Sequence, residues 1–189
     1  MEWFKAAEKF NQALSSSDPV PGGGAAAAMT AAMGCSLALM AAGTTLLKKN
    51  TSEQARTRLE SAMRKLGSFK TRLMELVQED AAAYSAYIVA KKLSKEDPSR
   101  TQAMQDALAY AASVPADTAT TALHCLGEIQ GMQSDVASVI LSDVHCARHL
   151  LQSALRCCIE NIQANLAFIQ DQTLTEKLHK QIETFAKSC

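Results

Sequence analysis

Residues 19–47 read PVPGGGAAAAMTAAMGCSLALMAAGTTLL, a proline–glycine turn followed by an alanine-rich run that carries no charge. Proline prevents a helix from continuing, and glycines let backbone N–H groups approach a partner closely. The turn should therefore present free donors at a helix N-terminus. Such donors form a cradle for an anion or another polar group. Small residues, including Gly34 and Gly43, lie on every side of the helix behind the turn, which we expect to be central and buried.

An uncharged run of this length could also cross a membrane, since about 20 apolar residues suffice to span a bilayer. Alanine, glycine, serine and threonine dominate the run, leucines are few, and the mean hydropathy of the whole chain is only -0.05. We therefore favour a buried core helix over a membrane anchor and expect no membrane partner.

The composition indicates one all-α domain. With 189 residues, the chain fits a single domain, residues 1–189, that is long enough to bury a core. Its 19 basic residues balance its 19 acidic residues, so we expect no nucleic-acid partner. The low counts of four prolines and eight glycines favour helices throughout.

The first residues and the cysteines suggest a cytoplasmic location. The opening sequence MEWFKAAEKF carries charges throughout and lacks the apolar segment of a secretory signal. The six cysteines form no CxxC motif and fall inside apolar helical patterns, which suits reduced thiols.

Apolar residues at helical spacing predict a bundle of long helices around the alanine-rich one. The other predicted segments are 3–14, a rod from a Thr51 or Ser52 cap to about residue 93, a helix opened by Asp97–Pro98, 116–129, a rod capped by Ser134–Asp135 that ends near residue 170, and 173–189. We expect Pro115 to interrupt the helix that starts at Asp97–Pro98, because proline lacks the N–H that helix propagation needs.

Asp80 falls on the apolar seam of the first rod when residues are counted in alternating steps of four and three. A buried carboxylate is either paired and functional or shifted toward its neutral form, since an isolated buried charge is costly. Alternatively, the seam drifts around a straight helix and leaves Asp80 at its margin. The residues alone leave both interpretations open.

Three polar residues mark the seam of the second rod. Asp143 and Asn161 interrupt it, and Asn165 lies one turn beyond Asn161. Buried side chains of this kind need hydrogen-bond partners from another helix, a water or a ligand. One buried asparagine often only fixes helix register, but several in line with buried carboxylates favour a polar pocket.

Two further pairs of residues could form sites. His145 and His149 lie four residues apart, but His145 points away from Asp143 and no glutamate completes a zinc motif, so we expect no metal. Lys48 and Lys49 follow the uncharged run, where the helix dipole favours positive charge. Their alternative role is to dock the acidic tail of a substrate.

Taken in order, these motifs resemble the cyclodeaminase/cyclohydrolase family of folate enzymes over nearly the whole chain. Each motif alone is weak, but their order and separations are fairly specific. The motifs are the PVPGGG turn with its alanine-rich helix, Thr45 with Lys48–Lys49, LVQEDAAAYSAYIVAKKLSK with Asp80, Val114–Pro115, Ser142–Asp143, and NIQANL with Asn161 and Asn165.

The resemblance implies an intertwined, all-helical homodimer that holds a tetrahydrofolate derivative in a cleft near the glycine turn. Members of the family cyclise formimino-tetrahydrofolate with release of ammonia, or interconvert methenyl- and formyl-tetrahydrofolate with water, without a metal or redox cofactor. We expect Asp80 and Asp143 to be the acid/base or orienting carboxylates. The expected substrate-binding residues are Pro21, Gly22, Gly23, Gly24, Lys48, Ser142, Asn161 and Asn165.

The sequence departs from the family pattern at two places. Ala25 follows the three glycines where the family often has serine, and VASVIL at residues 136–141 replaces a Gly-Asn element. These departures support an alternative function: a helical binding or scaffold protein that keeps the fold without catalysis.

Overall fold

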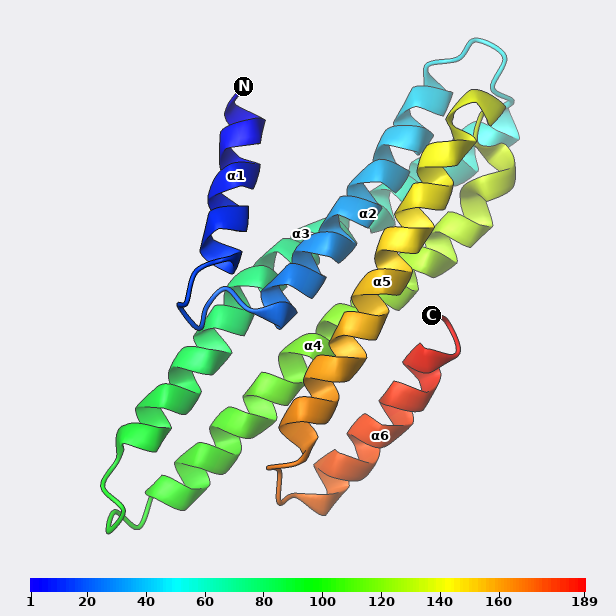
Figure 1. Ribbon diagram of the computed structural model, residues 1–189. Coiled ribbons are helices and arrows are strands. Elements are labelled where there is room, and N and C mark those ends of the chain that lie inside the picture. Colours follow the sequence, from blue (N-terminus) through cyan, green and yellow to red (C-terminus); the bar gives the residue numbers. More distant parts are fainter.

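A computed structural model describes every residue from Met1 to Cys189, and all of its regular structure is helical. The helices are α1 (Glu2–Leu14), α2 (Gly23–Leu46), α3 (Glu53–Lys92), α4 (Arg100–Met132), α5 (Leu141–Leu166) and α6 (Gln172–Ala186), with 3₁₀ turns at Gln133–Asp135 and Ser138–Ile140. Figure 1 shows α2 to α5 side by side in a bundle, α6 along its flank, and α1 standing apart. The predicted all-α fold is confirmed.

The alanine-rich helix α2 is one of the four bundle helices and not an axis with helices on every side. It packs between α3 and α5 and contacts α4 across the bundle. Twelve of its 24 residues are buried. On its outer side, Met33 and Met40 are 49% and 41% exposed. Within one chain, therefore, the expectation of a helix buried all round holds for the inner side only.

Small residues on α2 let α5 approach closely. A Cβ atom added to Gly34 would lie 2.9 Å from the Ala147 carbonyl oxygen and 3.0 Å from Leu151 Cγ, both tighter than ordinary contacts. Helix α2 is also long and apolar enough to cross a membrane, but 56% of its most apolar window is buried inside the chain. A core helix of a globular protein has these same properties.

Helix α3 follows the prediction closely. Ser52 caps it, because the Ser52 hydroxyl oxygen accepts a hydrogen bond of 3.2 Å from the Ala55 N–H. The helix then runs for 40 residues without a break, to Lys92. Its length brings Asp80, in its C-terminal half, to the start of α2.

Helix α4 differs from the prediction at Pro115. The expected interruption was wrong, since α4 runs from Arg100 to Met132 with Pro115 buried inside it. A proline removes one helical hydrogen bond but does not end a helix whose flanking turns are held by tertiary packing. The helix also begins later than predicted, because Asp97 instead caps the preceding turn and accepts a 2.9 Å hydrogen bond from the Ser99 N–H.

Helix α5 also begins later than predicted. The expected helix from Ser134 onward is replaced by the two 3₁₀ turns, and Val136 and Ala137 between them are extended. The Ala137 N–H donates a 3.1 Å hydrogen bond to the Thr45 hydroxyl oxygen near the end of α2. This tertiary bond takes the place of a helical one.

Candidate active site at the glycine turn

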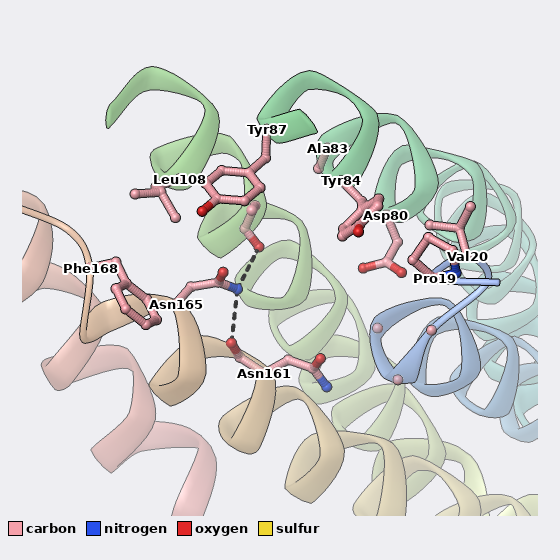
Figure 2. Close-up of a pocket in the computed structure, with 14 residues that line it drawn as sticks. Pro19, Val20, Asp80, Ala83, Tyr84, Tyr87, Leu108, Asn161, Asn165 and Phe168 are labelled. Carbon is pink, nitrogen blue, oxygen red and sulfur yellow. Dashed lines mark hydrogen bonds between the residues drawn. The ribbon is translucent and has the colours of Figure 1, made fainter. Parts of the chain in front are cut away.

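A cavity of about 320 Å³ opens where the glycine turn meets α3, α4 and the C-terminal end of α5 (Figure 2). Its volume lies at the lower end of the range for small-molecule sites. The turn contributes residues 22–24, α3 contributes Asp80, and α5 contributes Asn161 and Asn165. Residues predicted from three separate stretches of sequence therefore meet in one place.

Asp80 caps the N-terminus of α2 from a neighbouring helix. Gly22, at the usual capping position, has no side chain with which to do so. The Asp80 carboxylate takes this role, and its Oδ2 accepts a 2.9 Å hydrogen bond from the Ala25 N–H. A carboxylate is also favoured by the positive end of the helix dipole. The Ala25 N–H is a free donor of the kind expected at this turn, and the chain's own carboxylate accepts its hydrogen bond.

The three glycines of the turn differ in how much space they leave. A Cβ atom on Gly24 would overlap Asp80 Oδ1 and lie 2.7 Å from its Cγ, so only glycine allows this approach. A Cβ on Gly23 would touch the Asn161 amide at 3.4 Å, and one on Gly22 would lie 3.5 Å from the Pro19 carbonyl oxygen. No glycine in the chain has a positive φ. Space, and not backbone conformation, is therefore what the turn requires.

Burial raises the pKa of the Asp80 carboxyl, because a half-buried site disfavours its charged form. The hydrogen bond from the Ala25 N–H partly offsets this effect by stabilising the carboxylate. Asp80 is also the one acidic or basic side chain among the residues that line the cavity. A carboxyl group with a raised pKa in a cleft is suited to accept and return a proton.

The two asparagines present oxygen atoms to the cavity. Asn161 Nδ2 donates a 2.7 Å hydrogen bond to the Cys157 carbonyl. Asn165 Nδ2 donates to the carbonyls of Ala111, at 3.2 Å, and of Asn161, at 3.0 Å. Carbonyl partners fix which end of each amide is nitrogen, so both Oδ1 atoms are left as acceptors on the cavity side (Figure 2). Together with Asp80, they favour a ligand that is rich in N–H donors.

The side of the cavity away from α2 is largely apolar and contains aromatic rings. Figure 2 shows Tyr87, Leu108 and Phe168 around this part, which we call the aromatic end. Phe168 follows α5 and is 66% exposed. The Gln105 side chain holds its backbone: Nε2 donates to the Phe168 carbonyl at 3.1 Å, and Oε1 accepts from the Gln170 N–H at 2.8 Å. An exposed ring on a backbone held in this way offers a flat surface for a planar ligand.

Four predicted site residues do not line this cavity. Pro21 follows a cis peptide bond within the turn but does not itself line the cavity, whereas its neighbours Val20 and Gly22 do. Lys48 lies just beyond α2, about 36 Å from its start at the helical rise per residue. Ser142 and Asp143 lie in the first turn of α5, and Asp143 is about 27 Å from Asn161 by the same rule. Within one chain, these last three residues belong to the opposite end of the bundle.

Several cavity residues were not predicted as site residues. Tyr84 and Tyr87 lie one and two turns after Asp80 on the same seam, so their spacing could have indicated a shared face. Leu108 and Ala111 give no such signal, because apolar residues on a helix usually indicate core packing. Phe168 falls within the predicted rod that ends near residue 170, but in the structure it is exposed and lies beyond the end of α5.

Comparison with known proteins identifies what this arrangement resembles. A family model described as formiminotransferase-cyclodeaminase matches residues 6–184. The chain is 31% identical over 172 residues to formimidoyltransferase-cyclodeaminase of Mus musculus, covering 87% of this chain and 31% of that protein. It is 29% identical over 182 residues to methenyltetrahydrofolate cyclohydrolase of Methylorubrum extorquens, covering 93% of this chain and 86% of that one. The chain thus spans about a third of the first relative and most of the second.

A solved structure shares the fold. The crystal structure of formiminotetrahydrofolate cyclodeaminase from Thermotoga maritima superimposes with a TM-score of 0.87 at 26% sequence identity. The match covers 96% of this chain and 88% of that one. The resemblance seen in the sequence motifs therefore extends to the arrangement of the helices.

Proposed function

The chain belongs to the formiminotransferase-cyclodeaminase family, and from that premise we propose that it is a folate one-carbon enzyme. The substrate is a tetrahydrofolate derivative bound in the cavity beside the glycine turn. The reaction is either cyclisation of formimino-tetrahydrofolate with release of ammonia or hydrolysis of methenyl-tetrahydrofolate. The names of the relatives support both versions, since one is a cyclodeaminase and another a cyclohydrolase.

The two reactions make the same demands on a protein. In the cyclodeaminase reaction, N10 of the folate adds to the formimino carbon. The nitrogen of the formimino group is then protonated and leaves as ammonia. In the cyclohydrolase reaction, a water adds to the methenyl carbon and loses a proton, and one C–N bond then opens to leave a formyl group. Each passes through a tetrahedral carbon and needs a proton moved at nitrogen or oxygen. Neither changes an oxidation state, so the proposal includes no redox cofactor.

The environment of Asp80 gives this proposal its strongest support. Its carboxylate is half-buried in the cavity, its pKa is raised, and the Ala25 N–H fixes its orientation. In the cyclodeaminase version, Asp80 in its protonated form donates a proton to the leaving nitrogen. In the cyclohydrolase version, ionised Asp80 accepts a proton from the attacking water. One carboxyl group can therefore serve either reaction.

The rest of the cavity fits a reduced pterin ring. Such a ring carries several N–H donors along its edges, and the Oδ1 atoms of Asn161 and Asn165 are free to accept hydrogen bonds from them. The rings at the aromatic end can pack against the flat faces of the substrate. At about 320 Å³, the cavity suits the ring system better than the whole folate, so the glutamate tail would extend outside.

We also propose that the chain works as a homodimer in the cytoplasm. Helix α1, which stands apart from the bundle in Figure 1, has no buried residue, and its Trp3 and Phe4 are 66% and 56% exposed. The outer side of α2 exposes Met33 and Met40. A second copy that covers both apolar surfaces would remove them from water. Six unpaired thiols support a reducing compartment. Light scattering should give the mass of a dimer, and Met33→Glu with Met40→Glu should shift it toward the monomer.

Two assays on the purified protein test the function. Addition of protein to methenyl-tetrahydrofolate should speed the loss of its near-ultraviolet absorbance, or addition to formimino-tetrahydrofolate should release ammonia. Asp80→Asn keeps the size and the hydrogen-bond acceptor of the side chain but cannot exchange a proton, so it should reduce whichever activity is found by about 10³-fold. A parent protein that is inactive in both assays, under conditions in which a relative is active, would refute the enzymatic proposal and favour a binding or scaffold protein.

A further inference from the structure

A buried proline inside α4 leaves one backbone carbonyl without its helical partner. In an α-helix, the N–H of each residue donates to the carbonyl four residues earlier. Position 115 is proline and has no N–H, so the Ala111 carbonyl receives no helical bond from it. Pro115 is buried within the helix, and Ala111 lines the cavity. The helical bond is therefore missing at the very carbonyl that faces the site.

The side chain of Asn165 uses this carbonyl. Asn165 Nδ2 comes from α5 and donates a 3.2 Å hydrogen bond to the Ala111 oxygen (Figure 2). Its second hydrogen goes to the Asn161 carbonyl at 3.0 Å. Both N–H groups of the amide are thus occupied, and its Oδ1 is the atom left for a ligand. The orientation of Asn165 depends on two carbonyls, and one of them is free because of Pro115.

We propose that Pro115 is a positioning residue for ligand binding. Because Pro115 has no N–H to donate, the Ala111 carbonyl oxygen is available to accept a hydrogen bond from Asn165 Nδ2. This bond orients the amide so that Asn165 Oδ1 faces the N–H groups of the substrate. The folate identity of that substrate rests on the function proposed above, whereas the link between Pro115 and Asn165 rests on the geometry of α4 and α5 alone. Proline is the least favourable residue inside a helix. A functional role accounts for its presence at a position where alanine would suit the helix better.

A double-mutant cycle tests the link. We would compare the parent with Pro115→Ala, Asn165→Ala and the double variant, and use Pro98→Ala, in the turn before α4, as the matched control. Calorimetry with 5-formyl-tetrahydrofolate gives Kd, and turnover gives KM and kcat. Loss of one well-oriented hydrogen bond should weaken binding by about three- to tenfold. We expect Pro115→Ala to raise Kd and KM by this factor, with a smaller change in kcat and no loss of thermal stability.

The double variant gives the decisive comparison. If Pro115 acts through Asn165, then Pro115→Ala should weaken binding in the parent but add nothing in the Asn165→Ala background. Equal factors in both backgrounds, or unchanged binding in Pro115→Ala, would overturn the proposal. Circular dichroism and the melting temperature identify a variant that fails to fold, and Pro115→Ser then provides a second substitution that restores the N–H.

A measurement without substrate separates this proposal from the proposed function. The Asn165 side-chain NH₂ group should give slowly exchanging NMR signals in the parent, and Pro115→Ala should speed their exchange, because the restored helical N–H then competes for the Ala111 carbonyl. Unchanged exchange would overturn the link even in an active enzyme. Faster exchange in a protein that neither binds nor converts folate would support the link and refute the folate function.

Discussion

The two ends of the helical bundle hold similar polar residues, but the residues are partnered differently. At the glycine-turn end, Asp80 and the oxygens of Asn161 and Asn165 face an open cavity. At the opposite end, polar groups bond to one another. Arg58 Nε donates to Asp135 Oδ2 at 2.7 Å, and the Thr51 hydroxyl donates to the Thr45 carbonyl at 2.7 Å. Asp80 and the asparagines at the first end have acceptors left for a ligand, whereas these groups at the second end join α3 to a 3₁₀ turn and fix the end of α2.

The acidic groups at the two ends show the same difference. Burial raises the pKa of Asp80 at the glycine-turn end, whereas the hydrogen bond from Arg58 lowers the pKa of Asp135 at the other. A carboxylate held charged by an arginine stabilises the fold. A carboxylate that loses solvation without gaining a cation is destabilised in its charged form, which structures commonly tolerate at functional sites. Substitutions at the two ends should therefore differ in their effects on activity and on stability.

Asp80→Asn should reduce kcat/KM by about 10³-fold, within the range for loss of a general acid or base. The asparagine oxygen can still accept the hydrogen bond from the Ala25 N–H, so the fold and substrate binding should persist. Steady-state kinetics and calorimetry together make the measurement. Activity within tenfold of the parent would remove Asp80 from the chemistry.

Gly24→Ala should lower kcat/KM by about 10²-fold, because the new methyl group would displace the Asp80 carboxylate from the N-terminus of α2. Gly22→Ala is the matched control, since a Cβ there meets its nearest atom, the Pro19 oxygen, at an ordinary 3.5 Å. Its activity should stay within about twofold of the parent. Equal losses in the two variants would mean that the turn needs flexibility and not space.

Phe168→Ala should raise KM about fivefold with little change in kcat, because aromatic packing of this kind is worth about 1 kcal/mol. Gln105→Ala should shift KM in the same direction by a smaller factor, since it frees the backbone that carries the ring. Gln102→Ala, on the outer side of α4, is the control. A loss confined to kcat would place Phe168 in the chemistry instead of in binding.

Asp143→Asn probes the opposite end and should change kcat/KM by less than about threefold if the site is complete within one chain. The reason is its separation of about 27 Å from Asn161 along α5. The catalytic role expected for Asp143 from the sequence stays a prediction that requires a second copy to bring the two ends together. A loss approaching that of Asp80→Asn would establish this shared site.

Thermal stability should depend on pH in opposite ways at the two ends. Asp80 has a raised pKa, so its ionisation costs stability; Asp80→Asn should melt a few degrees higher than the parent once the pH exceeds that pKa, and equally at low pH. Asp135 has a lowered pKa, so it contributes stability above the ordinary aspartate pKa that is lost as pH falls through its folded value. Asp135→Asn should therefore melt lower at neutral pH and match the parent in acid. Parallel curves would show that both groups are in similar environments.

The sequence was sufficient to predict helical rods and the polar residues on their seams, since both follow from periodicity. It could not separate Asp80 from Asp143, because each is an aspartate on an apolar stripe. Asp80 caps the N-terminus of a neighbouring helix, α2, whereas Asp143 lies in the first turn of its own helix, α5. Tertiary packing sets this difference. Leu108 also lines the cavity, but the sequence gives no sign of this, because an apolar residue on a helix usually indicates core packing.

Pro115 shows the limit of local rules most clearly. The rule that proline ends a helix treats the missing hydrogen bond as a loss within α4 alone. In the fold, the carbonyl that Pro115 leaves free is used by Asn165, 54 residues farther along the chain than Ala111. A contact between helices so distant in sequence has no local signature, so the continuous helix and its consequence became visible only in three dimensions.

We propose that folate binds at the glycine-turn end of the bundle, and an NMR titration with 5-formyl-tetrahydrofolate can locate the bound ligand. The backbone amide signals of Gly23, Gly24 and Ala25 should shift, whereas those of Thr51 and Ala137 at the opposite end should stay unchanged. Shifts confined to the opposite end, or no shifts at millimolar ligand, would contradict this proposal.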